Sequence, residues 1–383
     1  MANKLNDFLQ DSRALIGQEA TDVPVGADLA DWLTIRRFCA ALGDPNLLYK
    51  DPASGVATKY NSMIAPNTFV YAIRTPNSGA AYVQKDYSVS PFFTHGATEW
   101  HDIIRVGDRL NSSIRVSSVA EGKWNGNGKR TGEITSSVTY SNSYGGLIGT
   151  ATGTVSMYPH ERGKEDLLDR DIYRYSDEEI KQIEDGIEAE PEPRGKLLRY
   201  WDDVSVGEKL PQLVKGPVTL SDMMAWVVAE AKPLSLGALV YHDLKNKYPG
   251  RIRTNPTTNW PYWDADQEFE DILSSQDLGL KSPPTRGQLR VCLAGQVITH
   301  WMGDDGFLRS LNVGTPGHWV YGDTMWLNGE VAQKRTEQVD SETYYAIDVK
   351  LTGINQLGET ILEGSSTAYL PNPGHPVTLP IPH

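Results

Sequence analysis

The sequence predicts an α+β protein built from two similar units, each with a curved antiparallel sheet packed against an apolar helix. Three observations support this fold class. Segments between Glu99 and Tyr158 alternate apolar with polar residues and are rich in Thr, Ser and Val, which is typical of strands. Residues 63–74 and 287–302 are apolar nearly all round, which indicates helices in the middle of a domain. Finally, sequence features of the first half recur in order in the second.

A polar segment divides the chain. Charged residues crowd the stretch from His160 to Asp185, and Ser176 followed three residues later by Glu179 is the start signal of a capped helix. Glu-Pro repeats at 190–193 then end that helix. We therefore expect an N-terminal unit over 1–159, a linker with one polar helix over 160–196, and a C-terminal unit over 197–383.

Composition narrows the class of protein. The 383 residues are 39% apolar and 22% charged, which is typical of a globular chain that is long enough for two domains. The net charge of −13 argues against nucleic acid or an anionic membrane as the main partner. Cys39 and Cys292 are far apart in apolar contexts, which favours buried free thiols in a reducing compartment. No signal-like N-terminus and no run of about 20 apolar residues is present, so we expect a cytoplasmic protein.

The first unit has readable elements. Apolar residues at helical spacing predict a helix over 31–42, and the glycine, proline, Asp and Asn that follow predict a chain reversal. Strands are expected at 103–104, 110–119, 132–140 and 147–157. Asn-Gly-Asn-Gly at 125–128 is typical of a hairpin turn, and Gly145-Gly146 of the next one.

The second unit repeats the first at a nearly constant offset of about 214 residues. Three matches in order indicate a duplication better than any one of them does. The central helix of each half then starts near Asn67 and Gly287. The matched pairs are Tyr49 with Tyr262, Gly107 with Gly322, and Asn142 with Asn355.

The stretch Gly43–Asp51 carries the most information about function. Taken as four turn residues alone, it is explained by chain reversal. Taken together, it resembles the signature of the MaoC-like hydratases and dehydratases, Gly-Asp-x-Asn-Pro-[Leu/Ile]-His-x-Asp. The chain supplies Gly43, Asp44, Asn46, Leu48 and Asp51 of that signature, whereas Leu47 replaces the proline and Tyr49 the histidine. The resemblance implies a double hot-dog fold over nearly the whole chain.

The resemblance also implies a chemistry. In the family, an aspartate and a histidine five residues later act on one water, while a backbone amide at the start of the central helix holds the thioester oxygen. These roles fall on Asp44 and Tyr49 in the first half and on Thr257 and Tyr262 in the second. The oxyanion position falls on Asn67 and on Gly287. Neither half holds the Asp–His pair, so the usual dyad is not intact in either signature.

Other readings of these residues stay open. Asp44 can cap a turn while Tyr49 packs, as happens in non-catalytic halves. Aromatic residues including Trp260, Tyr262 and Trp263 can line a bulky cyclic or aromatic acyl site or belong to the core. His95 and His101 are expected to be structural, and His242 is expected to be exposed on the outer face of a helix. His300 is interpreted as part of a helix end, and Asp264–Glu268 as the first turn of a helix, so no metal site is expected.

The sequence therefore predicts a lyase: a hydratase or dehydratase that acts on an acyl-CoA thioester. Asp44, Tyr49 and Tyr262 are its expected catalytic residues, and Asn46, Asn67, Gly287 and Trp263 are expected to bind substrate. Coenzyme A enters as part of the substrate, with no separate cofactor, in the breakdown of fatty, steroid or aromatic acids. The alternatives are a non-catalytic acyl-CoA-binding subunit and another thioester reaction, such as hydrolysis. We expect a homodimer or a hetero-oligomer with another hot-dog protein.

Overall fold

The structure is a computed structural model of the chain. It describes residues 2–20, 26–77, 87–124, 130–159, 167–230 and 279–383, with short stretches at 245–246, 252–254, 259 and 261–263. Among these residues, no helix is long and apolar enough to cross a membrane.

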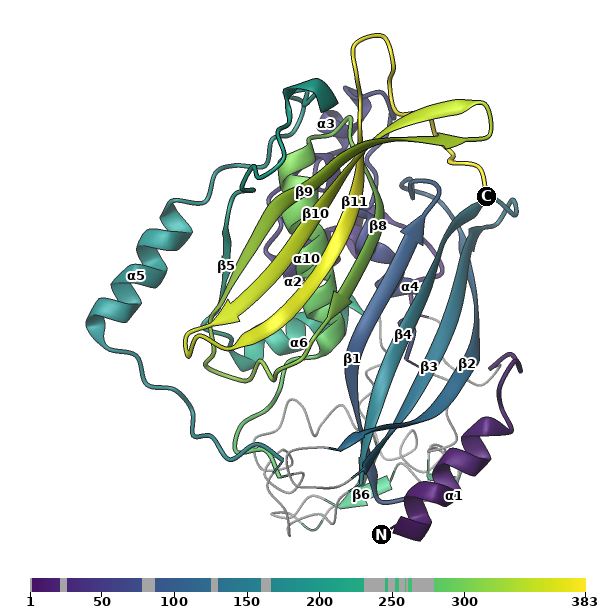
Figure 1. The fold of residues 1–383 in the computed structure, drawn as a ribbon, viewed down its shortest axis with the longest axis vertical. Helices are drawn as coiled ribbons and strands as arrows, with labels where there is room; N and C mark the ends of the chain where they lie inside the picture. Colours follow the sequence, from purple (N-terminus) through teal and green to yellow (C-terminus); the bar gives the residue numbers. More distant parts are fainter. Residues whose placement is uncertain are drawn as a thin grey trace.

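One antiparallel sheet of nine strands runs through the molecule, in the order β2-β3-β4-β1-β8-β11-β10-β9-β5 (Figure 1). Apart from the edge strand β5, the order is palindromic about the β1–β8 pair, where His95 lies opposite Gly314 and Glu99 opposite Ser310. The halves thus share one continuous sheet. Its strands are β1 (Val89–Trp100), β2 (Leu110–Trp124), β3 (Arg130–Asn142), β4 (Leu147–Pro159), β5 (Leu213–Lys215), β8 (Phe307–Gly314), β9 (Met325–Val339), β10 (Glu342–Asn355) and β11 (Thr360–Leu370). A separate pair joins β6 (Ile252–Thr254) to β7 (Pro261–Trp263).

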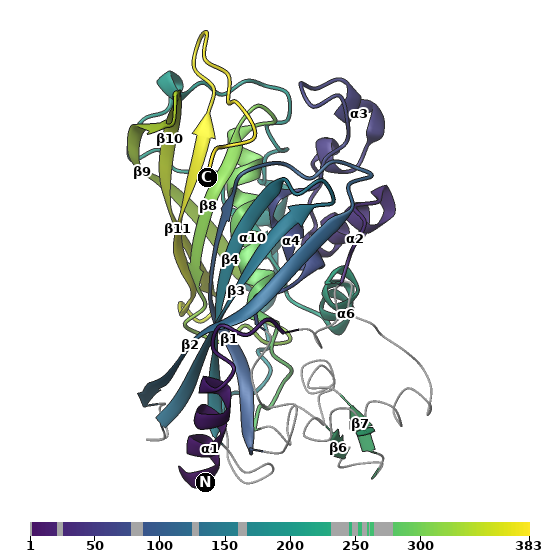
Figure 2. The same cartoon turned by 90° about the vertical axis from the view of Figure 1, so that its right-hand side faces the viewer.

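Helices cover one side of this sheet. Figure 2 shows α10, α4 and α2 on the same side, with α10 nearest the strands. All 16 residues of α10 are buried, as a central helix requires. The helices are α1 (Ala2–Arg13), α2 (Trp32–Leu42), α3 (Pro52–Val56), α4 (Val70–Ile73), α5 (Asp177–Glu188), α6 (Leu220–Ala229) and α10 (Gly287–Met302), with 3-10 turns η1 (Leu47–Tyr49), η2 (Asn67–Phe69) and η4 (Trp201–Asp203).

The helix before the signature loop forms where the sequence predicts it. Asp31 caps the start of α2 by accepting hydrogen bonds from the backbone N–H groups of Leu33 and Thr34. Gly43 ends the helix in the left-handed conformation, with φ of 60°, and its N–H bonds the carbonyl of Ala40. The N–H of Asp44 bonds the carbonyl of Cys39 at 2.8 Å. Local chemistry thus places Asp44 directly after the helix.

The two central helices differ in length. The prediction of a helix over 287–302 is confirmed by α10. The prediction over 63–74 is wrong at its beginning, because only Asn67–Ile73 are helical, as η2 and α4. Residues 63–65 run beside the chain after β1 instead, with Ala65 donating to the carbonyl of Ile104 and Val106 to that of Met63. Pro66 also disfavours a helical residue before it.

The first strand was placed too late in the chain by its sequence pattern. β1 covers Val89–Trp100, so residues 103–104 are not part of a strand. The N–H groups of His101 and Asp102 both donate to the carbonyl of Ile148, and the chain leaves the sheet at this point. The strands expected within 110–119, 132–140 and 147–157 are confirmed by β2, β3 and β4. The hairpin turn expected at 125–128 lies outside the described residues.

The duplication is visible in the turns. Gly107 and Gly322 precede β2 and β9 with φ of 95° and 86°, and Gly145 and Gly358 join the strands β3–β4 and β10–β11 with φ of 84° and 77°. The match of Tyr49 with Tyr262 is wrong, because Tyr49 ends the 3-10 turn η1 whereas Tyr262 lies within strand β7.

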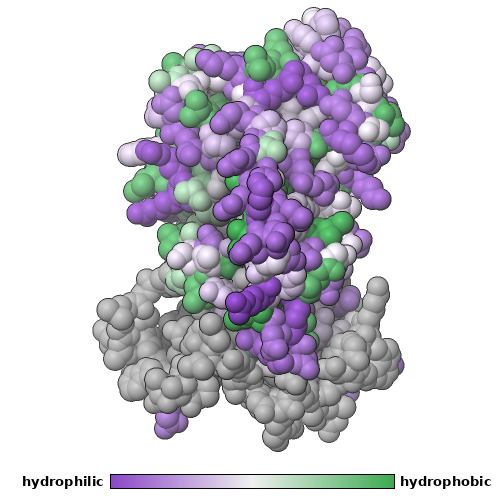
Figure 3. Space-filling view, turned by 90° about the vertical axis from the view of Figure 1, so that its left-hand side faces the viewer, coloured by the Kyte–Doolittle hydropathy of each residue, from purple (hydrophilic) through white to green (hydrophobic). Residues whose placement is uncertain are grey.

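The polar linker contains the helix α5, which begins with a complete capping box of Ser176 and Glu179. Figure 1 shows α5 projecting beside β5, and the face of the molecule on this side is largely hydrophilic (Figure 3). Ile183 is its buried residue, whereas Ile180 and Ile187 stay exposed. The architecture is that of an α+β double hot dog, in which the first half contributes four strands to the curved sheet and the second half contributes four matching strands and the short edge strand β5.

Candidate active site

A chain of side-chain-to-backbone hydrogen bonds shapes the loop that follows α2. Oδ1 of Asp44 accepts from the N–H of Asn46 at 2.9 Å, and Oδ1 of Asn46 accepts from the N–H of Leu48 at 3.0 Å. Asp51 then caps α3 by accepting from the N–H of Ser54 at 2.9 Å. Asp and Asn favour such local bonds. The loop therefore holds the Asp44 carboxylate in one orientation.

The second half places an imidazole against this carboxylate. Nε2 of His300, in the last turn of α10, lies 3.0 Å from Oδ1 of Asp44. The Asp44 side chain is 1% exposed and that of His300 7%. Two ionisable groups that lie 256 residues apart in the chain thus form a buried pair across the two halves. The other ring nitrogen of His300, Nδ1, is buried and has no hydrogen-bond partner among the residues that the structure describes.

Two further side chains tie the end of α2 to the second half. Nε2 of Gln296, one turn before His300, donates to the carbonyl of Gly43 at 3.3 Å and lies 3.3 Å from Nε2 of His300. Nζ of Lys215, from β5, donates to the carbonyl of Leu42 at 2.9 Å. Burial lowers the pKa of Lys215, whereas Glu190 and Asp44 oppose that shift. A cation at a helix C-terminus is favoured by the helix dipole.

Tyr49, which stands where the family signature has histidine, is buried beside this pair. Burial first, and then the charges of Asp44 and Asp304, raise the pKa of Tyr49 well above its usual range. A phenol in this state stays neutral at physiological pH, so Tyr49 is suited to donate a hydrogen bond and unsuited to act as a base.

A second carboxyl group approaches the loop from the chain that follows α10. Burial and then the charge of Asp305 raise the pKa of Asp304, while a hydrogen bond with the Asn46 side chain opposes the shift. Tyr60 donates to the backbone carbonyl of Asp304 at 3.0 Å. The end of α10 thus contributes both an imidazole and a carboxyl group beside the Asp44 loop.

Three other expected site residues lie at the starts of helical segments. Asn46 caps η1, and Asn67 starts η2 while its side chain donates to the carbonyl of Leu308 in β8 at 3.3 Å. Gly287 is the first residue of α10, where a Cβ atom would lie 2.6 Å from the carbonyl oxygen of Phe93, so only glycine fits. Both Asn67 and Gly287 therefore begin the helical segment of their half, the place at which backbone N–H groups lack helical partners.

Tyr262 and Trp263 lie in β7, opposite Arg253 and Ile252. Their side chains, together with Thr257 and Trp260, lie outside the described part of the structure. Within the described ranges, no group of three His, Cys, Asp or Glu side chains is arranged to hold a metal ion.

His300 is the residue that sequence reasoning missed. Its proximity to the glycine that ends α10 favoured a structural interpretation. A signal was nevertheless present, since Gln296 and His300 are polar residues one turn apart in a helix that is otherwise largely apolar. Buried polar groups need partners, and the partner here comes from the other half of the chain.

A cavity of about 490 Å³ lies between the linker and the start of the second half. Arg199, Glu208 and Trp301 are among its lining residues, and the indole N–H of Trp301 donates to Oε1 of Glu208 at 2.9 Å. Neither Asp44 nor His300 lines this cavity. It is therefore separate from the buried pair, although Trp301 follows His300 in the helix.

Comparisons with known proteins agree with this architecture. The family model of the FAS1-like dehydratase domain region matches residues 15–141. A protein of Streptomyces avermitilis named UPF0336 protein is 36% identical over 91 residues, which cover 22% of this chain and 59% of that protein. The chain thus spans about three fifths of the length of this relative.

Solved structures resemble nearly the whole chain. A MaoC-like dehydratase superposes with a TM-score of 0.64 at 17% identity, covering 94% of this chain and 99% of the other. A MaoC domain dehydratase of Chloroflexus aurantiacus gives 0.55 at 10% identity, covering 93% and 98%. A Mycobacterium tuberculosis protein with a double hotdog fold gives 0.53 at 13% identity, covering 93% and 96%. With its paired halves and its buried central helix, the chain has the double hot-dog fold of these structures, and its residues 15–141 match the family model of the FAS1-like dehydratase domain region.

Proposed function

We propose that this protein hydrates an enoyl-CoA thioester, or dehydrates the corresponding 3-hydroxyacyl-CoA. The observation that carries the proposal is the buried contact between Asp44 and His300, formed at the loop that resembles the family signature. A carboxylate and an imidazole are the two groups that the family uses to handle water. In this proposal His300 takes the role of the histidine that the signature of this chain lacks.

The reaction needs proton transfer and stabilisation of a developing oxyanion. A positioned acid or base contributes about 10²–10⁴ in rate. The thioester oxygen becomes negative as water adds, and backbone N–H groups at the start of a central helix are suitable donors for it. Asn67 and Gly287 start the helical segments of the two halves, and we assign one of these starts to the thioester.

The acyl group, the compartment and the assembly are part of the same proposal. The two cysteines, both free and buried, favour a reducing cytoplasm. Coenzyme A thioesters of fatty, steroid or aromatic acids are the substrates that we propose, because the loop Gly43–Asp51 resembles the signature of hydratases that act on acyl thioesters. A homodimer, or a complex with another hot-dog protein, is the assembly that we propose.

A second candidate is a subunit that binds acyl-CoA and leaves the chemistry to a partner chain. The observation that favours it is the replacement of the signature histidine by the buried, neutral Tyr49. Asp44 also has a structural duty, because its carboxylate shapes the loop through Asn46. Activity of the purified chain alone separates the two candidates.

The test uses the purified 383-residue chain and a panel of enoyl-CoA esters with straight, cyclic and aromatic acyl groups. We expect hydration, followed as loss of the conjugated thioester absorbance. Asp44→Asn should lower the rate by about 10²–10⁴, because the exchange preserves shape and removes the charge. Asp51→Asn is the matched control on the same loop; it should retain the rate, since Asn also caps helices well.

Two results would contradict the proposal. If Asp44→Asn keeps the full rate, the reaction is carried out elsewhere in the protein. If the wild-type chain binds acyl-CoA but hydrates it only after a second hot-dog protein is added, the binding-subunit function is correct.

A further inference from the structure

The two nitrogens of the His300 ring have different surroundings. Nε2 lies 3.0 Å from Oδ1 of Asp44, whereas Nδ1 is buried and, within the described part of the chain, has no hydrogen-bond partner. An ionised carboxylate only accepts hydrogen bonds, so the contact requires the proton on Nε2. Nδ1 of the neutral ring then carries a lone pair. The pair thus presents an unprotonated nitrogen inside the protein.

The opposite tautomer is less favourable. With the proton on Nδ1, a buried N–H would lack an acceptor, which costs about 1–3 kcal/mol. The lone pair on Nε2 would also face the Asp44 carboxylate. The amide of Gln296, 3.3 Å from Nε2, can donate to that lone pair, but it already donates to the carbonyl of Gly43. A hydrogen bond to a charged carboxylate is stronger than one from a neutral amide.

Burial makes Asp44 necessary once His300 accepts a proton. An isolated imidazolium that is 7% exposed would lose most of its hydration, at a large cost in free energy. A carboxylate 3.0 Å away compensates that charge directly. The loop bonds through Asn46 hold this carboxylate in position beforehand.

We propose that Nδ1 of His300 is the atom that moves the proton, and that Asp44 is a positioning residue that orients the ring and stabilises its charged form. This inference rests on the proposed hydratase function and deepens it. The catalytic base then comes from α10 of the second half and its partner carboxylate from the loop of the first. The signature position taken by Tyr49 needs no base.

The step balances with water and the enoyl thioester alone. The water oxygen forms a bond to C3 while one of its protons passes to Nδ1. The π electrons of the C2–C3 double bond move toward the thioester oxygen. The proton on Nδ1 then passes to C2 as the thioester carbonyl reforms, and His300 returns to its neutral state. The net change is addition of one water, and the reverse sequence is dehydration.

The first experiment tests the tautomer without any substrate. The protein is labelled with ¹⁵N in its histidine rings, and the His300 signals are assigned by their loss in His300→Gln. At mildly alkaline pH, where an ordinary histidine is neutral, we expect Nε2 at the shift of a protonated nitrogen and Nδ1 at that of an unprotonated one. A protonated Nδ1 would overturn the inference, whatever the activity of the protein.

The second experiment measures the rate. His300→Gln places an amide N–H near the position of Nε2, so it can still donate to Asp44 but offers no base. We expect hydration to fall by about 10²–10⁴ while the melting temperature stays close to that of the wild type. His95→Gln is the matched control, because Nε2 of His95 lies 2.7 Å from Oδ1 of Asn312 in a similar side-chain contact. It should retain the rate.

The double variant separates positioning from packing. Residues that act as one unit lose little more together than singly, so Asp44→Asn with His300→Gln should be about as slow as His300→Gln alone. A multiplied loss would contradict a shared role. An active wild type with a fully active His300→Gln overturns this inference and leaves the proposed function in place. A wild type inactive on every enoyl-CoA, alone or with a partner, overturns both.

Discussion

Single residues in this protein serve both the fold and the site. One oxygen of Asp44 accepts the N–H bond that shapes its loop and faces the His300 ring. Gln296 ties the same ring region to the carbonyl of Gly43. Such shared contacts explain why a carboxylate can be held rigidly in a buried place, since each lone pair that faces a donor reduces the cost of its burial.

One of the described histidines, His318, has a strongly lowered pKa. Burial, and then the charges of Arg290 and Arg170, lower the pKa of His318 to about 4. An unfolded chain restores it to about 6.5. Below 6.5 the unfolded state therefore binds more protons than the folded one, and stability is lost as the pH falls toward 4.

We expect acidification across this window to cost the wild type about 1–3 kcal/mol more than His318→Gln. Urea unfolding at a series of pH values measures the difference, with His95→Gln as control. Parallel pH curves for wild type and His318→Gln would show that His318 is protonated in the folded protein.

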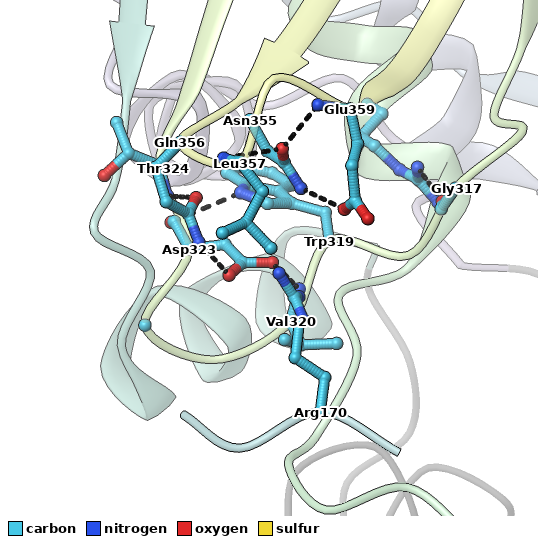
Figure 4. A network of polar contacts seen from close by, with 12 residues as sticks. Arg170, Gly317, Trp319, Val320, Asp323, Thr324, Asn355, Gln356, Leu357 and Glu359 are labelled. Atoms are coloured by element: carbon cyan, nitrogen blue, oxygen red, sulfur yellow. Dashed lines mark hydrogen bonds and ion pairs between the residues drawn. The ribbon is translucent and has the colours of Figure 1, made fainter. Parts of the chain in front are cut away.

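At the scale of elements, equivalent turns have diverged. Asp108 and Asp323 each follow the glycine that precedes β2 or β9, and each accepts a hydrogen bond from the N–H group three residues earlier. Only Asp323 is fully buried, and Figure 4 shows its carboxylate surrounded by Arg170 and Gln356. Nη2 of Arg170, from the linker, lies 2.6 Å from Oδ2, and Nε2 of Gln356 donates to Oδ1 at 2.6 Å.

The two turns should therefore respond differently to the same substitution. Asp323→Ala leaves the Arg170 charge without its partner, and breaking a buried pair in this way costs about 3–5 kcal/mol. Asp108→Ala loses one backbone hydrogen bond, worth about 1 kcal/mol. Denaturant unfolding measures both free energies. Equal losses in the free energy of unfolding would mean that the contact between Arg170 and Asp323 does not stabilise the second half.

At the scale of the molecule, the halves complete each other. The sheet is continuous through β1 and β8, Arg309 donates to the carbonyl of Trp100, and the end of α10 contacts the loop of the first half. A site assembled in this way forms only when both halves are folded and docked. Ligand that binds it should consequently stabilise the whole chain.

We expect the correct acyl-CoA to raise the melting temperature, because binding at about 100 times the dissociation constant adds about 2.7 kcal/mol to stability. The corresponding free fatty acid, measured in parallel by thermal unfolding, should have little effect. Identical melting curves with and without every acyl-CoA tested would contradict both candidate functions.

The sequence by itself predicted the elements that are specified by local residues. Asp31 and Gly43 mark the ends of α2, the apolar run over 287–302 marks α10, and the Ser176 box marks α5. The matching residues of the two halves, including the glycine turns, indicated the duplication, and the residues of the loop Gly43–Asp51 indicated the double hot-dog fold. The roles assigned to Asp44, Tyr49, Tyr262, Asn67 and Gly287 stay predictions.

Only the tertiary structure decided the rest. β1 has Pro91, His95 and Gly96 in its sequence and weak alternation, yet it forms a strand because β4 and β8 pair with both of its edges. Tyr49 and Tyr262 match in the sequence comparison of the two halves, but Tyr49 lies in a 3-10 turn and Tyr262 in a strand. The Asp44–His300 pair joins residues 256 positions apart. No local pattern in the sequence specifies such a contact, because it depends on how the two halves of the chain dock and bury their polar groups against each other.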